Sequence, residues 1–212
     1  MRDFDSVGIC RVRNKHAVLF QEGFLADHLS IICSGRVKVT ASSSNGRNFL
    51  LRVAGPGDIL GLPALHERKL HRVTAETLSL CTIKSIPTAG FTRIMETHAD
   101  ISRITALAIA RDYNSAFLSA RRLALHTSAA GKLASTLLDC ARMDNVSNNR
   151  APSNLPISFP MHLNQEDLGS MVGLSRETVS RLLTRFRREG LLEQSADRIT
   201  LSNPGRLEAR YH

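Results

Sequence analysis

The stretch Asn164–Leu192, NQEDLGSMVGLSRETVSRLLTRFRREGLL, predicts a short helix followed by a tight turn. Asn164 is a favourable N-cap, and Asp167 in the first turn suits the exposed backbone amides there. We therefore expect a helix over Gln165–Val172, which Gly173 ends.

A second helix is expected directly after this turn. Ser175 is its N-cap, it continues to about Glu189, and Gly190 is the glycine that follows its C-cap. Its apolar residues recur with helical periodicity and form one inward stripe: Val179, Leu182, Leu183 and Phe186. Because Gly169 allows the two helices to approach closely, the whole stretch predicts a helix-turn-helix.

The opposite face of the second helix is polar and rich in arginine. At about 100° per residue, the outward side chains are Glu177, Arg181, Thr184 and Arg188, with Arg176 and Ser180 on the flank. Arginine can donate two hydrogen bonds to guanine, and glutamate can accept one from cytosine. This face predicts sequence-specific binding to double-stranded DNA, whereas a plain helical hairpin with a solvated charged face is the alternative.

The global composition agrees with a DNA-binding protein of two domains. The chain has 212 residues, 42% hydrophobic content, a net charge of +9 and a pI near 10.1, which suit a folded protein with a polyanionic partner. No apolar run approaches the roughly 18 to 20 residues that span a bilayer, and no secretion signal is visible in the first fifteen residues. We expect a cytoplasmic protein without a membrane segment.

The rest of the chain predicts an α+β fold. Short β-branched segments separated by glycines, from Ala17 to about Lys84, indicate a sandwich or barrel such as a jelly roll. Helices are expected over about 91–97, 100–124 and 127–142, then a loop over 144–160 that leads to a short strand. The segments LLEQ and RITL, on either side of the turn SAD, predict a two-stranded wing. The expected domains are 1–98, a sensor; 99–126, a dimerisation helix; and 127–212, a winged helix-turn-helix.

The long helix is expected to form a homodimer, because a lone helix would expose its apolar face. Its apolar residues are Ile101, Ile104, Leu107, Ala108, Phe117, Leu118 and Leu125. Any heptad frame through them is interrupted by Arg111, Asn114 or Ser115, so packing within one subunit remains the alternative.

This arrangement resembles the Crp/Fnr superfamily of bacterial transcription regulators. The resemblance is carried by LGSMVGLSRETVSRLL at 168–183 and, more weakly, by FQEG, SGRVKV and GPGD at 20, 34 and 55. It implies base contacts from Arg176, Glu177, Ser180 and Arg181. It also implies a palindromic operator with a TGTGA-like or TTGAT-like half-site, read by two helices about 34 Å apart. RNA polymerase is an expected further partner.

Phosphate contacts are expected around the same helices. The resemblance places Ser175 and Thr178 against phosphates, which suits hydroxyls near a helix N-terminus. The full set expected to contact phosphate is Asn164, Ser175, Thr178, Arg185 and Arg188.

The sensor half departs from the cAMP-binding branch of that family. Where the branch has Gly-Glu for the ribose and Arg-Ser for the cyclic phosphate, this chain has Gly61-Leu62 and Arg72-Val73. Phe117 and Leu118 stand where that branch has a hydroxylic pair. These six residues are the candidate effector pocket, and we expect an effector other than cAMP, or activity without one.

The cysteines, the histidines and the catalytic motifs decide which other cofactors and activities are expected. The cysteines at 10, 33, 81 and 140 lack metal-binding spacing, and Cys10 alone cannot hold an iron–sulfur cluster near the N-terminus. Haem stays a candidate through His66 and His71. No catalytic motif is found, so no enzyme is expected. The alternative to a DNA-binding regulator is a ligand-responsive signalling module that contacts other proteins.

Overall fold

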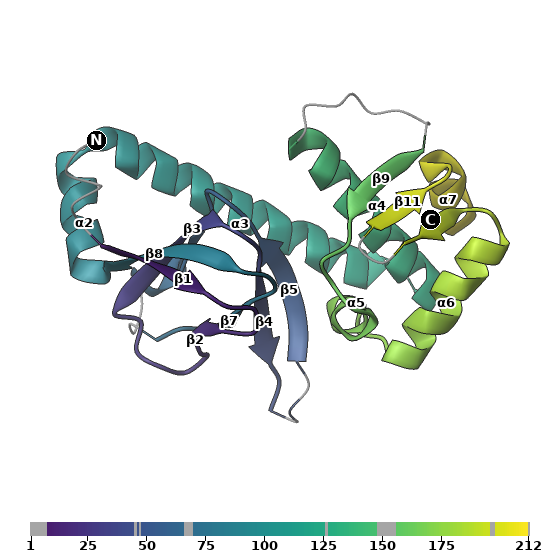
Figure 1. Cartoon of the computed structure of the whole chain (residues 1–212), viewed down its shortest axis with the longest axis horizontal. Helices are drawn as coiled ribbons and strands as arrows, with labels where there is room; N and C mark the ends of the chain where they lie inside the picture. Colours follow the sequence, from purple (N-terminus) through teal and green to yellow (C-terminus); the bar gives the residue numbers. More distant parts are fainter. Residues whose placement is uncertain are drawn as a thin grey trace. The chain divides into compact units, whose positions relative to one another are not determined.

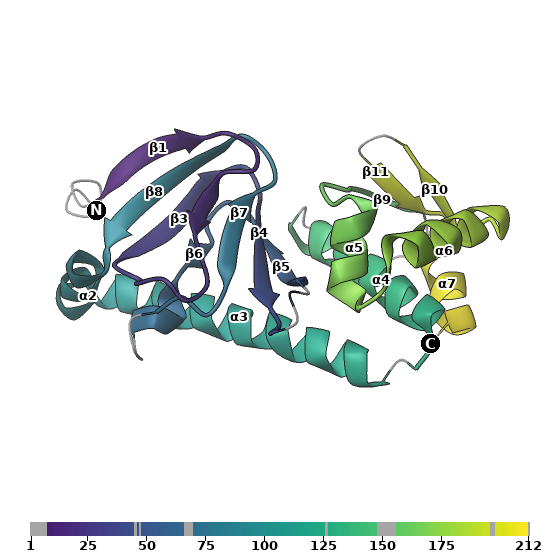
Figure 2. The same cartoon turned by 90° about the horizontal axis from the view of Figure 1, so that it is seen from below.

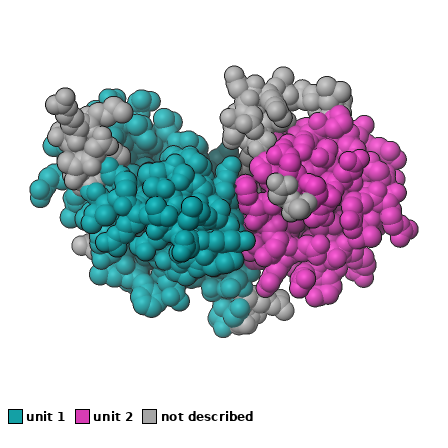
Figure 3. Space-filling view, in the orientation of Figure 1, with its two compact units in different colours: residues 1–117 teal, residues 118–212 magenta. Residues whose placement is uncertain are grey.

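The computed structural model describes residues 8–44, 46, 48–65, 70–125, 127–147, 156–195 and 198–211. The chain forms two compact units, 1–117 and 118–212 (Figure 3). The long helix α3 (Ala99–Leu125) crosses the boundary between these units. Within the described residues, no helix combines the length and hydropathy needed to cross a membrane.

The first unit is built on two four-stranded antiparallel sheets (Figures 1 and 2). In spatial order, the first sheet contains β1 (Ile9–Arg13), β8 (Cys81–Pro87), β3 (His28–Ser34) and β6 (Ile59–Leu60). The second contains β2 (Val18–Phe20), β7 (Thr74–Thr77), β4 (Val37–Ser42) and β5 (Asn48–Ala54). The predicted jelly roll is confirmed, although β1 lies before the region predicted to be β-rich.

Two apolar clusters hold this unit together. The cluster between the sheets consists of Ile32, Val37, Val39, Ala54, Leu60, Ala75, Cys81 and Ile83. The other lies where the outer face of the first sheet meets the helices: Leu29, Ile59, Leu62, Ile86, Phe91 and Ala108. Period-2 alternation along β3 and β8 supplies both clusters, because successive side chains point to opposite faces of the sheet.

Helix α2 (Thr88–Thr97) begins three residues before the predicted start near Phe91. Pro87 directly precedes it with an extended ψ of 135°. Thr88 is fixed to the loop before β3, since its backbone N–H donates to Asp27 O at 2.8 Å and its hydroxyl donates to Ala26 O at 3.1 Å. The start of α2 is therefore set by contacts with Ala26 and Asp27, which lie about sixty residues earlier in the chain. Helix α3 agrees with its predicted bounds to one residue at each end.

The second unit is a winged helix-turn-helix. It contains α4 (Ala129–Ser147), β9 (Ile157–Pro160), α5 (Gln165–Val172), α6 (Arg176–Arg188), β10 (Leu192–Gln194), β11 (Arg198–Leu201) and α7 (Pro204–Tyr211). Helix α4 extends five residues beyond its predicted end. The predicted wing is confirmed, and β9 completes it as a third strand beside β11. Residues 148–155 of the predicted loop and Ala196 and Asp197 of the predicted turn lie outside the described residues.

Helix α7 was not predicted from the sequence. Asn203 caps it, accepting a hydrogen bond from the backbone N–H of Arg206 at 2.8 Å, and Pro204 occupies its first position. It packs against α4.

Local hydrogen bonds build the α5–α6 pair as predicted. The Asn164 side chain accepts from the Asp167 backbone at 2.8 Å, and the Asp167 carboxylate accepts from the Asn164 backbone at 3.4 Å, which completes a capping box. Gly173 takes the left-handed conformation at φ 70°. A Cβ on Gly169 would lie 2.5 Å from the carbonyl oxygen of Leu174, so glycine at this position lets the turn fold back on α5.

Candidate DNA interface

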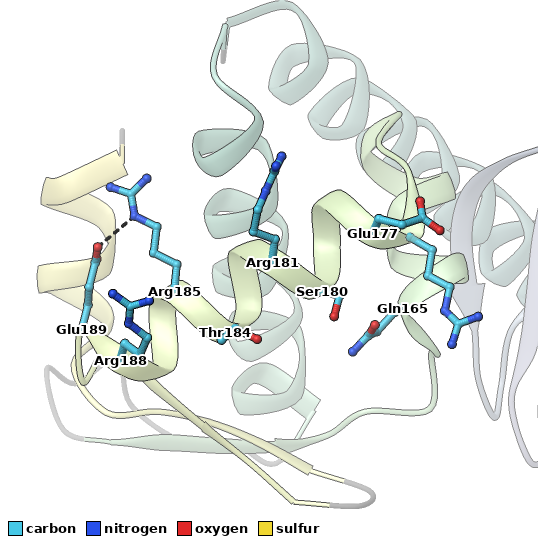
Figure 4. A pocket seen from close by; sticks show the side chains of 9 residues that line it. Gln165, Glu177, Ser180, Arg181, Thr184, Arg185, Arg188 and Glu189 are labelled. Atoms are coloured by element: carbon cyan, nitrogen blue, oxygen red, sulfur yellow. Dashed lines mark hydrogen bonds and ion pairs between the residues drawn. The ribbon is translucent and has the colours of Figure 1, made fainter.

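The polar face of α6 forms one wall of an open hollow of about 860 Å³ (Figure 4). Its lining residues are Gln165, Arg176, Glu177, Ser180, Arg181, Thr184, Arg185, Arg188 and Glu189. Gln165 comes from the first turn of α5, and the others follow α6 from its first residue to its C-cap. The buried stripe of Val179, Leu182, Leu183 and Phe186 fixes this orientation, because it holds the opposite face of α6 in the core.

All four residues predicted to contact bases line this hollow. Arg176, Glu177 and Arg181 are exposed, and Ser180 is half-buried. Among the residues that the structure describes, neither Arg176 nor Arg181 forms an ion pair with an acidic side chain. Their donors are therefore directed to solvent and available to an external acceptor.

Glu177 is held as a charged acceptor at the start of α6. Its pKa lies below the ordinary value, chiefly because its carboxylate accepts a hydrogen bond from its own backbone N–H and then one from the Ser175 hydroxyl. An ionised carboxylate has only acceptor sites, which matches the amino group of cytosine in the major groove.

The residues predicted to contact phosphate divide into two groups. Asn164, Ser175 and Thr178 take part in the helix caps: Ser175 Oγ accepts from the Thr178 backbone at 3.2 Å and lies 3.1 Å from the Thr178 hydroxyl. Arg185 and Arg188 line the hollow. Arg188 forms no ion pair within the described part of the chain, whereas Arg185 forms one with Glu189.

Glu189 organises the C-terminal end of α6. Its carboxylate accepts from Arg185 Nε at 2.9 Å, from Tyr211 Oη at 2.8 Å and from Arg210 Nε at 3.0 Å. The hydrogen bond from Arg185, followed by that from Tyr211, lowers the pKa of Glu189. The Tyr211 ring lies 4.9 Å from the Phe186 ring, with the Arg185 guanidinium 5.5 Å above it. This cluster fastens α7 to α6.

The sequence did not identify Gln165, Glu189 or Tyr211 as parts of this surface. Gln165 directly follows the predicted N-cap, so its position at the start of α5 was a usable signal. The contact between Glu189 and Tyr211 spans 22 residues and depends on α7, which was not predicted.

The six candidate effector residues differ in burial and in the parts of the fold that they contact. Leu62 is buried in the core between the first sheet and the helices, and Val73 packs against the core between the sheets. Arg72 is exposed. Phe117 and Leu118 are 55% and 42% exposed on α3. Gly61 has φ 94°, and a Cβ there would lie 3.5 Å from the His71 ring.

An ion-pair chain that the sequence did not reveal ties α3 to the β unit. Arg52 on β5 donates from one nitrogen to Asp58 at 3.2 Å and from the other to Asp112 on α3 at 2.8 Å. The Arg52 side chain is 17% exposed. Burial raises the pKa of Asp112 in spite of this arginine, because the desolvation of the carboxylate outweighs the attraction.

His66 and His71 are the two candidate haem ligands. His66 lies outside the described residues. His71 is buried, with its ring stacked 3.9 Å from the Phe20 ring, and burial lowers its pKa. Within the described residues, no three His, Cys, Asp or Glu side chains converge as a metal site.

Two family models match the two units. Residues 131–210 match the Crp-like helix-turn-helix domain, and residues 11–98 match the cyclic nucleotide-binding domain. The chain is 27% identical to the CRP-like cAMP-activated global transcriptional regulator of Mycobacterium tuberculosis, over 91% of this chain and 83% of that protein. It is 26% identical to the cAMP-activated global transcriptional regulator CRP of Pasteurella multocida, over 83% of this chain and 81% of that protein.

Solved structures show the same fold at lower identity. FixK2 from Bradyrhizobium japonicum superposes with a TM-score of 0.78 at 22% identity, over 96% of each chain. The c-di-GMP responsive regulator CLP of Xanthomonas campestris also gives 0.78, at 21% identity, over 94% of this chain and 96% of that one.

Proposed function

Because the chain belongs to the Crp/Fnr superfamily of DNA-binding transcription regulators, we propose that it binds a palindromic operator as a homodimer, with one α6 helix in each half-site. The observation that carries this proposal is the outward set Arg176, Glu177, Ser180 and Arg181, which lines one open hollow. RNA polymerase remains an expected partner of such a regulator.

The chemistry of this set favours a half-site that contains G·C pairs. Arg176 and Arg181 each offer two parallel donors for guanine O6 and N7, and Glu177 accepts from cytosine N4. Arg188, at the far end of α6, supplies a charge for a phosphate that flanks the bases. A TGTGA-like or TTGAT-like half-site provides partners for these groups.

The dimer is proposed to form along α3. Ile109, Tyr113 and Phe117 follow one another at four-residue intervals and are 50%, 72% and 55% exposed. The Tyr113 and Phe117 rings stack at 6.4 Å. Of the apolar residues predicted for the seam, Ile101 and Ala108 pack instead against the β unit, so they are not part of this face.

The effector is proposed not to be cAMP. The relatives above are cAMP-activated, but this chain has the buried Leu62 in place of a ribose carboxylate and the core residue Val73 in place of a phosphate-binding hydroxyl. Arg72 alone retains the expected chemistry, and it is exposed. The residues present do not fit a cyclic nucleotide.

Selection from a random pool of DNA duplexes by the purified full-length protein, without added ligand, tests this proposal. We expect enrichment of a palindrome whose half-sites contain TGA and whose centres are one helical turn apart, about 34 Å. Enrichment of unrelated, non-palindromic sequences would contradict the dimer. Failure of any sequence to enrich, repeated with cyclic nucleotides and with haem, would contradict DNA binding in favour of a protein partner.

The salt dependence of binding separates DNA from a protein partner. Each phosphate contacted lowers the slope of log K against log salt by roughly 0.9, so operator affinity should fall steeply with salt. The exposed Glu177 on the same face of α6 also argues against a protein partner, since glutamate is depleted at protein interfaces.

A further inference from the structure

A second cavity, of about 680 Å³, lies within the β unit. It is lined by residues of β1, β2, β3 and β8, by the segment between β2 and β3, and by His71, which precedes β7. None of the six candidate effector residues lines it. Its volume falls within the roughly 300 to 1,000 Å³ typical of small-molecule sites.

The register of the first sheet explains the polar part of its wall. Ile9 pairs with Ser85, and Ser85 pairs with Ser30, so these three side chains form one row on the same face. In the next row on this face, Arg11 pairs with Ile83. Both serines and Arg11 line the cavity.

Ser30 is a buried hydroxyl that opens into this space. The residue is 6% exposed, and its side chain forms no hydrogen bond with any described residue. A buried hydroxyl of this kind is unfavourable unless a bound molecule or a water in the cavity supplies its partner, and a ligand with an acceptor group can take that place. This is the second, independent sign that the cavity takes a ligand.

The opposite wall is apolar and unusually open. Phe24 and Leu25 line the cavity and are 62% and 63% exposed, and Val18 on β2 is 56% exposed. Phe20 completes this wall with its ring stacked on His71. These side chains offer an apolar molecule a large contact area.

The charged groups favour an anion. Arg11 and Arg13 form no ion pair within the described part of the chain. Asp27, the acidic residue of the lining, is paired with His28 at 2.8 Å. Burial lowers the pKa of His71, which disfavours its charged form. The net positive character of the lining therefore comes from the two arginines.

We propose that this cavity binds a small organic carboxylate with an apolar body. The carboxylate accepts hydrogen bonds from Arg11 and from the hydroxyls of Ser30 and Ser85, and the apolar body lies against Phe20, Phe24 and Leu25. This site is distinct from the cyclic-nucleotide positions and does not depend on the proposed DNA binding.

Isothermal titration calorimetry of the full-length protein tests the site with octanoate, and with 1-octanol as the neutral molecule of equal chain length. Octanoate should bind at least tenfold more tightly than octanol, because the alcohol lacks the charge that Arg11 recognises. Arg11→Gln should weaken octanoate binding about tenfold and leave octanol binding unchanged. Ser30→Ala should weaken octanoate binding severalfold.

The matched control is Arg103→Gln, which removes the same charge from an exposed position on α3 outside the cavity. It should bind octanoate like the wild type. Equal binding by the Arg11→Gln and wild-type proteins, as adsorption on the exposed apolar side chains of α3 would give, overturns the proposal. No measurable octanoate binding overturns it as well.

Discussion

At the scale of single residues, the arginines of α6 differ according to what already holds them. Arg185 is held by Glu189 and lies over the Tyr211 ring, and Arg187 donates to the Thr184 hydroxyl at 3.1 Å. Arg176 and Arg181 have no acidic partner among the described residues. We assign base reading to these two and a positioning role to Arg185, because a guanidinium in an existing ion pair is less available to DNA.

Replacement of Arg181 should change the specificity of binding. Arg181→Ala removes one bidentate base contact, so we expect operator affinity to fall by about 1–3 kcal/mol and the preference at one base pair to relax. The measurement is a titration of the selected operator and of its single-base variants. Arg187→Ala is the control, because it removes the same charge from the same helix outside the hollow. If Arg181→Ala keeps the wild-type base preference at every position, the assignment is wrong.

Gly169 is required by space, not by its backbone angle. Gly169→Ala places a Cβ 2.5 Å from the Leu174 carbonyl oxygen, and a backbone atom cannot rotate away. We expect the free energy of unfolding of the second unit to fall by about 1–3 kcal/mol, measured by urea unfolding. In the control Gly173→Asn, the site has φ 70° and nothing within 4 Å, so near wild-type stability is expected. Equal stabilities of both variants would contradict this account.

At the scale of elements, α3 carries three different faces. One face contributes Ile101 and Ala108 to the core with the β unit and places Asp112 against Arg52. A second face presents Ile109, Tyr113 and Phe117 to solvent. A third exposes Ile104, Leu107, Leu118 and Leu125. At about 100° per residue, the two exposed faces point in widely different directions, so a two-helix seam can use only one of them.

The Asp112 contact makes the stability of the β unit depend on pH. Its pKa is raised on folding from the ordinary 3.8, so the folded protein binds this proton more tightly. The contribution of Asp112 to stability is fully present below pH 3.8 and is lost as pH rises through the folded pKa. As pH rises from 3.8 through the folded pKa of Asp112, the unfolding free energy of the wild type should therefore fall relative to that of Asp112→Asn.

Urea unfolding of both proteins, at several pH values from below 3.8 to neutrality, measures this difference. The control is Asp100→Asn in the exposed first turn of α3, which removes the same charge without touching Arg52. If the unfolding free energy of the wild type instead rises relative to that of Asp112→Asn as pH increases, the attraction of Arg52 outweighs the desolvation of the Asp112 carboxylate.

At the scale of the whole molecule, the proposed function depends on joining two copies. A palindromic operator requires two α6 helices at a fixed spacing, so monomers would lose most of the affinity. We propose that the face of Ile109, Tyr113 and Phe117 forms the seam, because its two aromatic rings already stack and offer large exposed apolar side chains to a partner helix.

Charge substitution on each exposed face of α3 distinguishes the two possible seams. Tyr113→Glu should raise the dimer dissociation constant more than tenfold, because it would bury a carboxylate against its symmetry mate. Leu107→Glu, on the other exposed face, should leave the dimer intact. Sedimentation equilibrium measures both. A monomeric Leu107→Glu protein together with a dimeric Tyr113→Glu protein would place the seam on the other face.

The sequence by itself determined the α5–α6 pair and the side chains on the outward face of α6. Each cap bond in this pair joins residues three apart, and the apolar stripe of α6 follows the helical period, so the information is local. The glycine-punctuated strands, α3 and the wing were predictable for the same reason. The helical period alone therefore suffices to place Arg176, Glu177, Ser180 and Arg181 on one surface.

Only the tertiary structure decided which charged side chains already have partners within the protein, and where the β unit contains a cavity. The contacts of Asp112 with Arg52 and of Tyr211 with Glu189 join separate elements. Strand β1 has its partner β8 about seventy residues later, and that pairing brings Arg11 beside the Ser30–Ser85 row. No local period encodes such contacts, because they depend on which elements pack together once the core has formed.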